Sequence, residues 1–295
     1  MTPQLCLGTA QFGLAYGITN TTGQVSEAEV AQLLMQAQDA GIVYLDTAQA
    51  YGNAETVLGR HLHDGHVFQL ISKLPAQPQH SFTAADQAIW EQTFQASCER
   101  LGMKSLDALL LHAPADLRKP GSHHLEAWLL SLRERGLVKR LGVSIYEASD
   151  LDGVDPILLD LVQLPLSLYD QRLLQDGTLY RLSAATTVHA RSVYFQGLLL
   201  TPSEQWPSWV APEVLLHHQR LEALAQDRGC QLIDLALGFA KVQKDLEAVV
   251  LGLCSCRELV ELETSWAAIP PWQDGEWQAW ALQDLGILDP RRWSH

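Results

Sequence analysis

Short apolar runs alternate with longer stretches of helical periodicity along the whole chain. The runs are rich in leucine and β-branched residues, as buried strands are, and the stretches between them carry apolar residues at the spacing of one helix face. Strands that alternate with helices in this way form parallel sheets, and eight such units close a barrel. We therefore predict an α/β fold, a (β/α)8 TIM barrel. Its eight expected strands are QLCLG (4–8), IVYLD (42–46), FQLISKL (68–74), LDALLLH (106–112), KRLGVS (139–144), LDLVQLP (159–165), TTVHARS (186–192) and EAVVLG (247–252).

Capping residues mark the ends of two of the intervening helices. Ser26 followed by Glu29 is a capping box ahead of AEVAQLLMQAQDAG, where Gly41 supplies a stop. The stretch FTAADQAIWEQTFQASCERLG also has helical periodicity and ends at Gly102. Because the alternation runs evenly and no linker interrupts it, we predict a single domain over residues 1–295.

Two regions depart from this rhythm. Residues 200–212, LTPSEQWPSWVAP, follow an expected strand and are rich in Pro and Trp, so we expect a long loop at the active face of the barrel. A polar, Trp-rich tail begins at about residue 269 with IPPW. We expect this tail to cover the barrel mouth or its edge, with its tryptophans packed rather than exposed.

The charge balance narrows the possible partners. The chain has 20 Lys and Arg against 34 Asp and Glu, a net charge of −14, and no dense basic stripe, so we predict that it does not bind nucleic acid. No apolar stretch approaches the roughly 20 residues of a membrane helix. The N-terminus MTPQLCLGTAQ lacks the basic and apolar parts of a signal peptide. Five scattered cysteines fit a reducing compartment, and we predict a cytoplasmic protein without a membrane partner.

Cysteine and histidine pairs could indicate a metal, but their spacing argues against it. No second ligand pair accompanies Cys254 and Cys256, so two small thiols near a strand end are the better interpretation. We predict no metal site. The clustered histidines are expected to be solvated surface groups: His61, His63, His66, His123, His124, His217 and His218.

Four groups able to exchange or steer protons come from successive strand–helix units. Asp46 ends one expected strand, Tyr51 lies in the loop after it, Lys73 lies near the end of the next strand, and His112 ends the one after that. Carboxyl ends of barrel strands meet at the active face. A buried ammonium there needs a carboxylate, and Asp46 is the nearest candidate.

This set of groups suits the reduction of a carbonyl. A cation beside Tyr51 is expected to lower its pKa from about 10, which makes the hydroxyl a usable proton donor. His112 can hydrogen-bond the same substrate oxygen and orient it. None of these groups supplies hydride, so a nicotinamide cofactor is implied.

The motifs around these residues resemble the aldo-keto reductase family over nearly the whole chain. LGTAQFG is similar to the family's first-strand glycine segment, and DTAQAYGNAETVLG to its long Asp- and Tyr-bearing motif. ISKL, LLLHAP, RGLVKRLGVSIY and VQLPLSL resemble later strands of the family. The resemblance implies a (β/α)8 barrel that reduces an aldehyde or ketone, sugars included, with NADP(H) in preference to NAD(H) and without metal. Its implied catalytic tetrad is Asp46, Tyr51, Lys73 and His112.

The resemblance also implies which residues hold the cofactor. Ser144 and Gln163 match the positions at the nicotinamide carboxamide, and LGLCSCRELVEL resembles the adenosine-phosphate loop. The full implied set is Gly8, Thr9, Ser144, Gln163, Arg191, Ser192, Gly252, Ser255, Arg257 and Glu261.

Three departures from the family pattern change what we expect of the cofactor. Ile145 stands where an Asn usually follows the Ser, and Arg191 stands where a Tyr usually stacks on nicotinamide, so we expect Arg191 to cover the ring instead. Glu258 stands where an Arg is common, which leaves Arg257 as the cation of the phosphate loop. A 2′-phosphate requires cations, so these changes predict weak discrimination between NADPH and NADH.

Two other functions are compatible with the same residues. A regulatory protein could bind a nicotinamide nucleotide with little turnover. A Schiff-base aldolase could use Lys73 as a nucleophile on the same kind of barrel.

Overall fold

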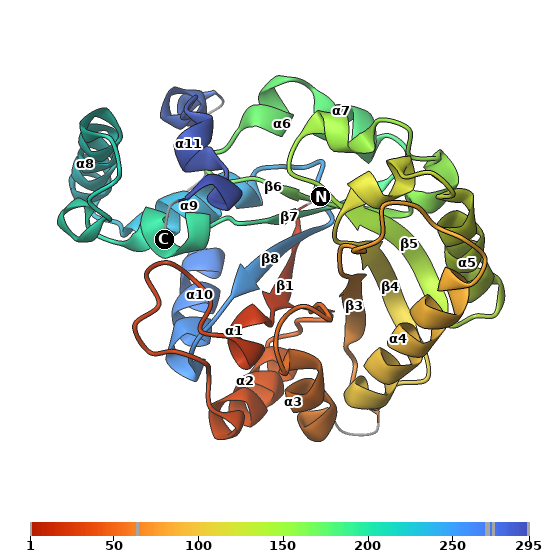
Figure 1. Ribbon diagram of the computed structural model, residues 1–295. Coiled ribbons are helices and arrows are strands. Elements are labelled where there is room, and N and C mark those ends of the chain that lie inside the picture. The colour runs from red at the N-terminus through yellow and green to blue at the C-terminus, as the bar shows by residue number, and fades with distance from the viewer. Residues whose placement is uncertain (1, 63–64, 269–271, 273–274, 294–295) are drawn as a thin grey trace.

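The computed structural model describes residues 2–62, 65–268, 272 and 275–293, and its centre is a closed barrel of eight parallel strands (Figure 1). Each strand pairs with its neighbours in chain order, and β8 pairs with β1 to close the ring. The fold predicted from the sequence is therefore confirmed. The strands are β1 (Gln4–Gly8), β2 (Tyr44–Asp46), β3 (Gln69–Leu74), β4 (Leu106–Leu111), β5 (Val138–Ser144), β6 (Leu161–Pro165), β7 (Thr187–Arg191) and β8 (Ala248–Gly252).

Strand register brings the expected site residues to the carboxyl ends of the barrel strands. Gly8 is paired with Asp46, Ser144 with Gln163, and Pro165 with Arg191, all at the carboxyl ends of their strands. All eight expected strands are present, and no strand end is displaced by more than two residues. The largest shifts are at β2, which begins at Tyr44, and β6, which begins at Leu161.

Helices surround the barrel, as Figure 1 shows. Short 3-10 turns lie among the loops, including η4 (Phe195–Leu200), η5 (Ser203–Gln205), η6 (Glu276–Trp280) and η7 (Pro290–Arg292). The α-helices are α1 (Ala10–Gly13), α2 (Glu27–Asp39), α3 (Ala54–His61), α4 (Asp86–Leu101), α5 (His123–Glu134), α6 (Arg172–Gln175), α7 (Thr178–Ser183), α8 (Pro212–Asp227), α9 (Leu232–Lys241), α10 (Cys256–Ala268) and α11 (Leu285–Leu288).

The two helices with predicted caps begin and end close to where the sequence indicates. The Ser26 side chain accepts a hydrogen bond from the Glu29 amide at the start of α2, and Gly102 ends α4 in the left-handed conformation. Only the Ser26 half of the capping box forms. The carboxylate of Glu29 instead accepts a hydrogen bond from the Cys256 amide, 2.6 Å away at the start of α10. Glu29 therefore joins the first long helix to the last one.

The inside of the barrel is apolar in the middle and charged at the amino ends of the strands. The apolar layer consists of Cys6, Tyr44, Ile71, Ala108, Leu110, Leu161 and Ala248. Below it, Arg140 pairs with Asp107 and with Glu247, and buried His189 contacts Glu247 at 2.8 Å. This amino-end cluster satisfies charges that would otherwise be costly inside a barrel.

The Pro- and Trp-rich loop and the tail pack together beside α8 and α9 (Figure 1). Residues 200–212 form a loop that contains η5, and the buried Trp206 donates to the Thr201 carbonyl at 2.9 Å. In the tail, buried Trp272 donates to the Leu235 carbonyl of α9, and buried Trp293 contacts Trp209 with ring centroids 5.5 Å apart. Residues 269–271, 273–274 and 294–295 of the predicted tail lie outside the described residues.

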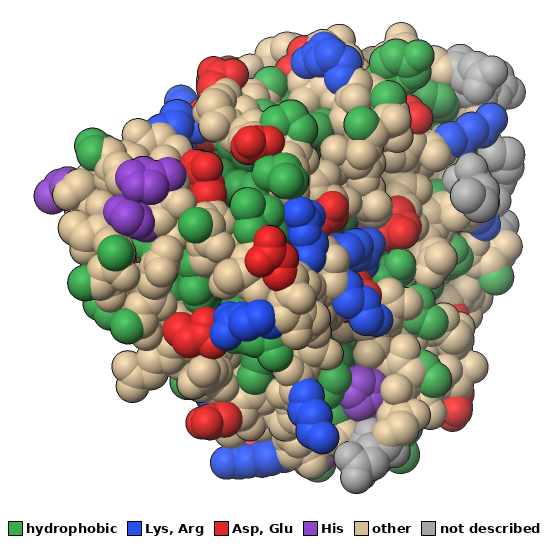
Figure 2. Space-filling model, turned by 90° about the vertical axis from the view of Figure 1, so that its right-hand side faces the viewer, with side chains coloured by type: hydrophobic (Ala, Val, Ile, Leu, Met, Phe, Trp, Pro, Cys, Tyr) green, Lys and Arg blue, Asp and Glu red, His purple; other side chains and the backbone are tan. Residues whose placement is uncertain are grey.

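The surface carries mixed charge. On the face in Figure 2, Lys and Arg side chains are interspersed with Asp and Glu and form no continuous basic stripe. Among the described residues, no helix is both long enough and apolar enough to cross a membrane.

A buried carboxylate connects three elements near the site. Glu55, at the start of α3, is 2% exposed and accepts hydrogen bonds from Ser72 on β3 at 2.7 Å and Ser97 on α4 at 2.6 Å. Arg100 forms an ion pair with its other oxygen at 2.7 Å. Since hydrogen bonds to a charged group are stronger than neutral ones, Glu55 holds α3 and α4 against the barrel.

We expect Glu55→Gln to lower the free energy of unfolding by about 2–3 kcal/mol, because the amide is a weaker acceptor and cannot satisfy Ser72, Ser97 and Arg100 together. Urea denaturation measures this loss. Glu27→Gln is the matched control, since Glu27 pairs with Arg60 on the surface and such pairs contribute up to about 1 kcal/mol. Equal losses in the two variants would contradict the assignment.

Candidate active site

A cavity of about 680 Å³ opens at the carboxyl ends of the strands. Its volume lies within the roughly 300–1,000 Å³ typical of ligand sites. The lining includes most residues that the sequence predicted for the site: Gly8, Thr9, Asp46, Tyr51, His112, Gln163, Arg191, Ser192, Gly252 and Glu261. Lys73, Ser144 and Ser255 contact this group or its neighbours, whereas Arg257 points into solvent with 87% of its side chain exposed.

A buried ion pair lies at the base of the cavity. The Lys73 ammonium is fully buried and contacts Asp46 Oδ1 at 2.5 Å and the Thr47 carbonyl at 3.0 Å. Gln163 donates to the other oxygen, Asp46 Oδ2, at 2.7 Å. The predicted Asp46–Lys73 pair is therefore present, and β2, β3 and β6 each contribute one of its polar members.

Tyr51 is positioned by a close approach between two loops. Its amide donates to the Ala48 carbonyl at 3.0 Å, and its carbonyl accepts from the Ala54 amide at the start of α3. A side chain at Gly13 would place its Cβ only 1.9 Å from the Tyr51 carbonyl oxygen, so α1 needs glycine there. The Lys73 ammonium lies 5.1 Å from the centre of the Tyr51 ring.

The pKa of Tyr51 differs from the sequence-based expectation. Burial raises the pKa of the Tyr51 hydroxyl above its usual value, although Lys73 opposes this shift. The expected lowered pKa is therefore wrong for the chain alone, because the loss of solvent outweighs one neighbouring cation. Tyr51 consequently keeps its proton at neutral pH.

His112 faces Tyr51 in an edge-on arrangement, with ring centroids 6.0 Å apart. Burial lowers the pKa of His112 to about 4, and the cations Lys73 and Arg191 add to the effect. The imidazole is therefore neutral at physiological pH. It can exchange one hydrogen bond with a ligand without bringing a charge into the site.

Arg191 lines the same cavity from the end of β7. Its guanidinium donates to Ser144 Oγ at 3.3 Å, Ser192 Oγ at 3.2 Å and the Ile145 carbonyl at 2.9 Å. It also lies over the Tyr146 ring, 4.2 Å from the centre. Arg191 thus bridges the ends of β5 and β7.

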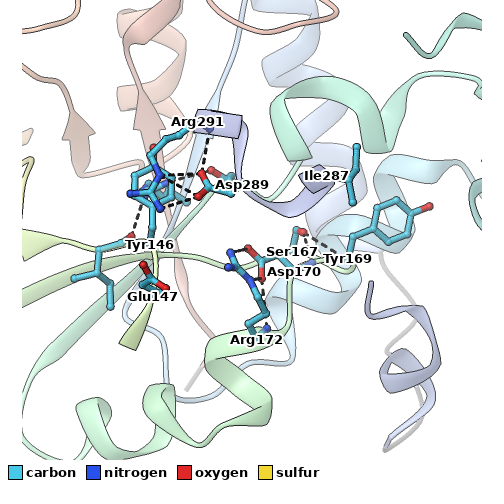
Figure 3. Close-up of polar contacts among 12 residues, drawn as sticks. Tyr146, Glu147, Ser167, Tyr169, Asp170, Arg172, Ile287, Asp289 and Arg291 are labelled. Carbon is cyan, nitrogen blue, oxygen red and sulfur yellow. Dashed lines mark hydrogen bonds and ion pairs between the residues drawn. The ribbon is translucent and has the colours of Figure 1, made fainter. Parts of the chain in front are cut away.

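The tail reaches this cluster. Arg291 lies over the same Tyr146 ring at 4.0 Å and forms an ion pair with Asp289 at 2.7 Å. Figure 3 shows Arg291 and Asp289 beside Tyr146, with the separate pair of Asp170 and Arg172 nearby. Asp289, Tyr146 and Arg291 could not be assigned to the site from the sequence, because no motif links the tail to the strand ends.

The α10 end of the cavity is acidic. The Glu258 carboxylate accepts a hydrogen bond from the Cys254 amide at 2.7 Å, and Ser255 Oγ accepts from the Glu258 amide at 3.2 Å. Arg257 pairs with Glu261 at 2.8 Å on the surface of α10. Two amides that could receive an anion at this helix start, those of Cys254 and Cys256, are thus already bonded to carboxylates.

Loops from both sides of the barrel meet above the cavity. Residues 14–22, after α1, and residues 192–197, after β7, both contribute to its lining. A Cβ at Gly197 would lie 1.9 Å from Thr19 Oγ1, so the two loops are in direct contact. Ser192, Phe195 and Gln196 have positive φ angles of 61°, 54° and 54°, which is strained for residues with side chains and common near ligand sites.

Several shielded polar atoms in the cavity wall lack a partner among the described residues. They are Gln11 Oε1, Gln163 Oε1 and the Tyr194 hydroxyl. Buried polar atoms are normally hydrogen-bonded, so unpaired ones that face a cavity are available to a polar ligand. An acceptor at Gln163 beside the tetrad fits the amide of a nicotinamide. The cavity is therefore suited to a nicotinamide nucleotide.

The expectation that the clustered histidines lie at the surface is wrong for His218. His218 is fully buried, with Nδ1 2.7 Å from the Tyr169 hydroxyl and Nε2 2.9 Å from the Thr201 carbonyl. The sequence predicts it at the surface together with its neighbour His217. His63 lies outside the described residues. Within the described part of the chain, no three His, Cys, Asp or Glu side chains are grouped to hold a metal ion.

Comparison with known proteins identifies the family. The sequence pattern of the Aldo/keto reductase family matches residues 4–280, so this chain belongs to that family. An aldo-keto reductase of Mycolicibacterium vanbaalenii is 34% identical over 139 residues, which are 45% of this chain and 46% of the relative. The aligned part thus spans about half the length of the curated relatives.

Solved structures share the fold over most of the chain. An aldo-keto reductase of Bacillus halodurans in its holo form is similar with a TM-score of 0.71 and 19% identity, and the match covers 94% of this chain and 90% of the other. A glycerol dehydrogenase of Gluconobacter oxydans is similar with a TM-score of 0.68 and 20% identity, with the same coverage. At this level of identity the likeness concerns the fold.

We expect Lys73→Met to lower the free energy of unfolding by about 3–5 kcal/mol, because it leaves Asp46 buried without its cation. Thermal or urea denaturation measures the loss. Lys139→Met is the control, since Lys139 is 71% exposed and lies 3.6 Å from Asp107. If the two variants are equally stable, the buried pair is not held together as described.

Proposed function

We propose that this protein is an NAD(P)H-dependent oxidoreductase that reduces an aldehyde or ketone to an alcohol, with Tyr51 as the proton donor. The observation that carries the proposal is the placement of a protonated tyrosine and a neutral histidine above the buried Lys73–Asp46 pair. The overall reaction takes a carbonyl, a reduced nicotinamide nucleotide and a proton to an alcohol and the oxidised nucleotide. When bound, the nicotinamide supplies the hydride.

The residues of the chain supply the proton and the orientation. Tyr51 gives its proton to the substrate oxygen as negative charge develops there, and the nearby Lys73 ammonium stabilises the resulting phenolate. Asp46 keeps Lys73 protonated and in place. The neutral His112 holds the substrate oxygen by a hydrogen bond.

The cofactor is proposed to be held along the cavity from Gln163 to α10. Gln163 Oε1 is available for the nicotinamide amide, and Ser144, Arg191 and Ser192 form the adjoining wall. Gly8, Thr9, Gly252, Ser255 and Glu261 belong to the remaining surface or lie next to it. Glu258 and Glu29 accept hydrogen bonds from the Cys254 and Cys256 amides at this helix start, and Arg257 is turned away. We therefore propose only weak preference for NADP(H) over NAD(H).

A Schiff-base aldolase is disfavoured by the state of Lys73. Burial tends to lower the pKa of Lys73, but Asp46 and Tyr51 outweigh it and raise the pKa above its usual value. A protonated, ion-paired amine is a poor nucleophile.

We expect Tyr51→Phe to reduce carbonyl turnover by about 10²–10⁴, because the general acid is lost, while nucleotide affinity stays within a few-fold. Steady-state kinetics with a panel of aldehydes and ketones, and nucleotide titration, measure the two quantities. Tyr180→Phe is the matched control, since Tyr180 is 72% exposed. Undiminished turnover in Tyr51→Phe refutes the mechanism, and saturable binding without turnover in the wild type favours a regulatory nucleotide-binding protein.

We expect the dissociation constants of NADPH and NADH to differ by no more than about 30-fold, the equivalent of roughly 2 kcal/mol. Arg257→Ala should leave the dissociation constants of both nucleotides nearly unchanged, because Arg257 points into solvent and is paired with Glu261. Glu258→Gln should tighten the binding of NADPH relative to that of NADH, because it removes a negative charge near the 2′-phosphate. Quenching of tryptophan fluorescence measures the dissociation constants of both nucleotides in the wild type and the two variants. A preference of the wild type for NADPH beyond about a thousandfold would mean that cations from elsewhere reach the 2′-phosphate.

A further inference from the structure

The catalytic end of the cavity contains one net positive charge. Lys73 and Asp46 cancel one another as an ion pair. Tyr51 and His112 are both neutral at physiological pH. Arg191 is the one Lys or Arg side chain among the described residues that line the cavity, so the remaining charge is its guanidinium.

The charge of Arg191 is not neutralised by the residues around it. All three of its hydrogen-bond acceptors are uncharged, namely two serine hydroxyls and the Ile145 carbonyl. Nearby arginines differ, since Arg172 is paired with Asp170 and Arg291 with Asp289 (Figure 3). Within the described part of the chain, no carboxylate lies at ion-pair distance from Arg191. The next acidic groups in the cavity lining beyond Asp46 are Glu258 and Glu261 at the α10 end.

Arg191 is also fixed in position. Its three hydrogen bonds and the contact with the Tyr146 ring restrain a side chain that is normally flexible. In the register of β6 and β7, Arg191 is opposite Pro165, two residues beyond Gln163. Gln163 and Arg191 therefore face the same part of the cavity. Gln163 Oε1 is unpaired there and can accept a hydrogen bond from an amide.

We propose that Arg191 makes this site discriminate between the two redox states of the nicotinamide, and that it disfavours the oxidised form. This inference rests on the proposed function. The oxidised ring carries a positive charge and the reduced ring carries none, while the rest of the nucleotide is identical. Like charges a few Å apart in a partly buried site repel one another. A fixed guanidinium without an ion-pair partner therefore weakens the binding of NAD+ and leaves the binding of NADH largely unaffected.

This selectivity has a direct kinetic meaning. A site that rejects the oxidised nucleotide fills with the reduced one even where the oxidised form is in excess. Inhibition by the oxidised product is correspondingly weak. Arg191 is thus a specificity-determining residue, whereas the chemical step is assigned to the tetrad.

The test compares the dissociation constants of NAD+ and NADH, measured by quenching of tryptophan fluorescence. We expect the wild type to bind NADH at least about tenfold more tightly than NAD+. Arg191→Met should reduce this ratio by about tenfold, which corresponds to about 1.4 kcal/mol. Arg191→Lys should keep most of the ratio, because it keeps the charge. Arg181→Met is the matched control, since Arg181 on α7 is exposed, lacks an ion pair among the described residues and lies outside the cavity lining.

Three results would overturn the proposal: equal affinities in the wild type, an unchanged ratio in Arg191→Met, or an equal loss in Arg191→Lys and Arg191→Met. The wild-type comparison needs no variant, so equal affinities there overturn the proposal even if Arg191→Met does not fold, and Arg191→Lys gives a second variant at the same position. Absence of saturable binding by either nucleotide refutes the proposed function itself. Binding of both with no redox selectivity refutes only the role of Arg191.

Discussion

The buried ion pair between Lys73 and Asp46 is the interaction on which the site depends. An ammonium inside a barrel is tolerated only beside a carboxylate, so β2 and β3 must keep the register that brings the two together at 2.5 Å. The pair then sets its surroundings. Gln163 donates a hydrogen bond to the second carboxylate oxygen of Asp46. The charge on Lys73 lies beside the phenol ring of Tyr51. A single electrostatic requirement thus fixes side chains from three strands and a loop.

Much of the barrel and of its catalytic end could be predicted from the sequence. Strand positions follow from the apolar runs, and Asp46, Lys73 and His112 follow because carboxyl ends of parallel strands converge. What could not be predicted depends on packing between distant segments. The raised pKa of Tyr51, the burial of His218 and the approach of Arg291 to Tyr146 all arise from contacts that no local pattern records. Arg257 is an intermediate case, because its loop was identified but not its orientation.

Charges in the cavity are distributed unevenly, and this distribution gives the site its character. A positive group lies at the catalytic end, where Arg191 has neutral partners, and carboxylates lie at the α10 end, where Glu258 and Glu29 bond backbone amides. The same helix start would otherwise attract anions. Glu29 and Glu258, which are far apart in the sequence, therefore make the α10 end of the cavity acidic, whereas Arg191 makes the opposite end positive.

The charged cluster at the amino ends of the strands bears on how the sequence can vary in evolution. Arg140, Asp107, Glu247 and His189 hold the barrel closed from below, and an apolar layer separates them from the cavity. Closure of the ring and the shape of the upper loops are therefore nearly independent. Insertions and substitutions in residues 14–22 or 200–212 can accumulate without opening the barrel. Because the scaffold is separate from the variable surface, substrate specificity can evolve through the loops while the barrel stays the same.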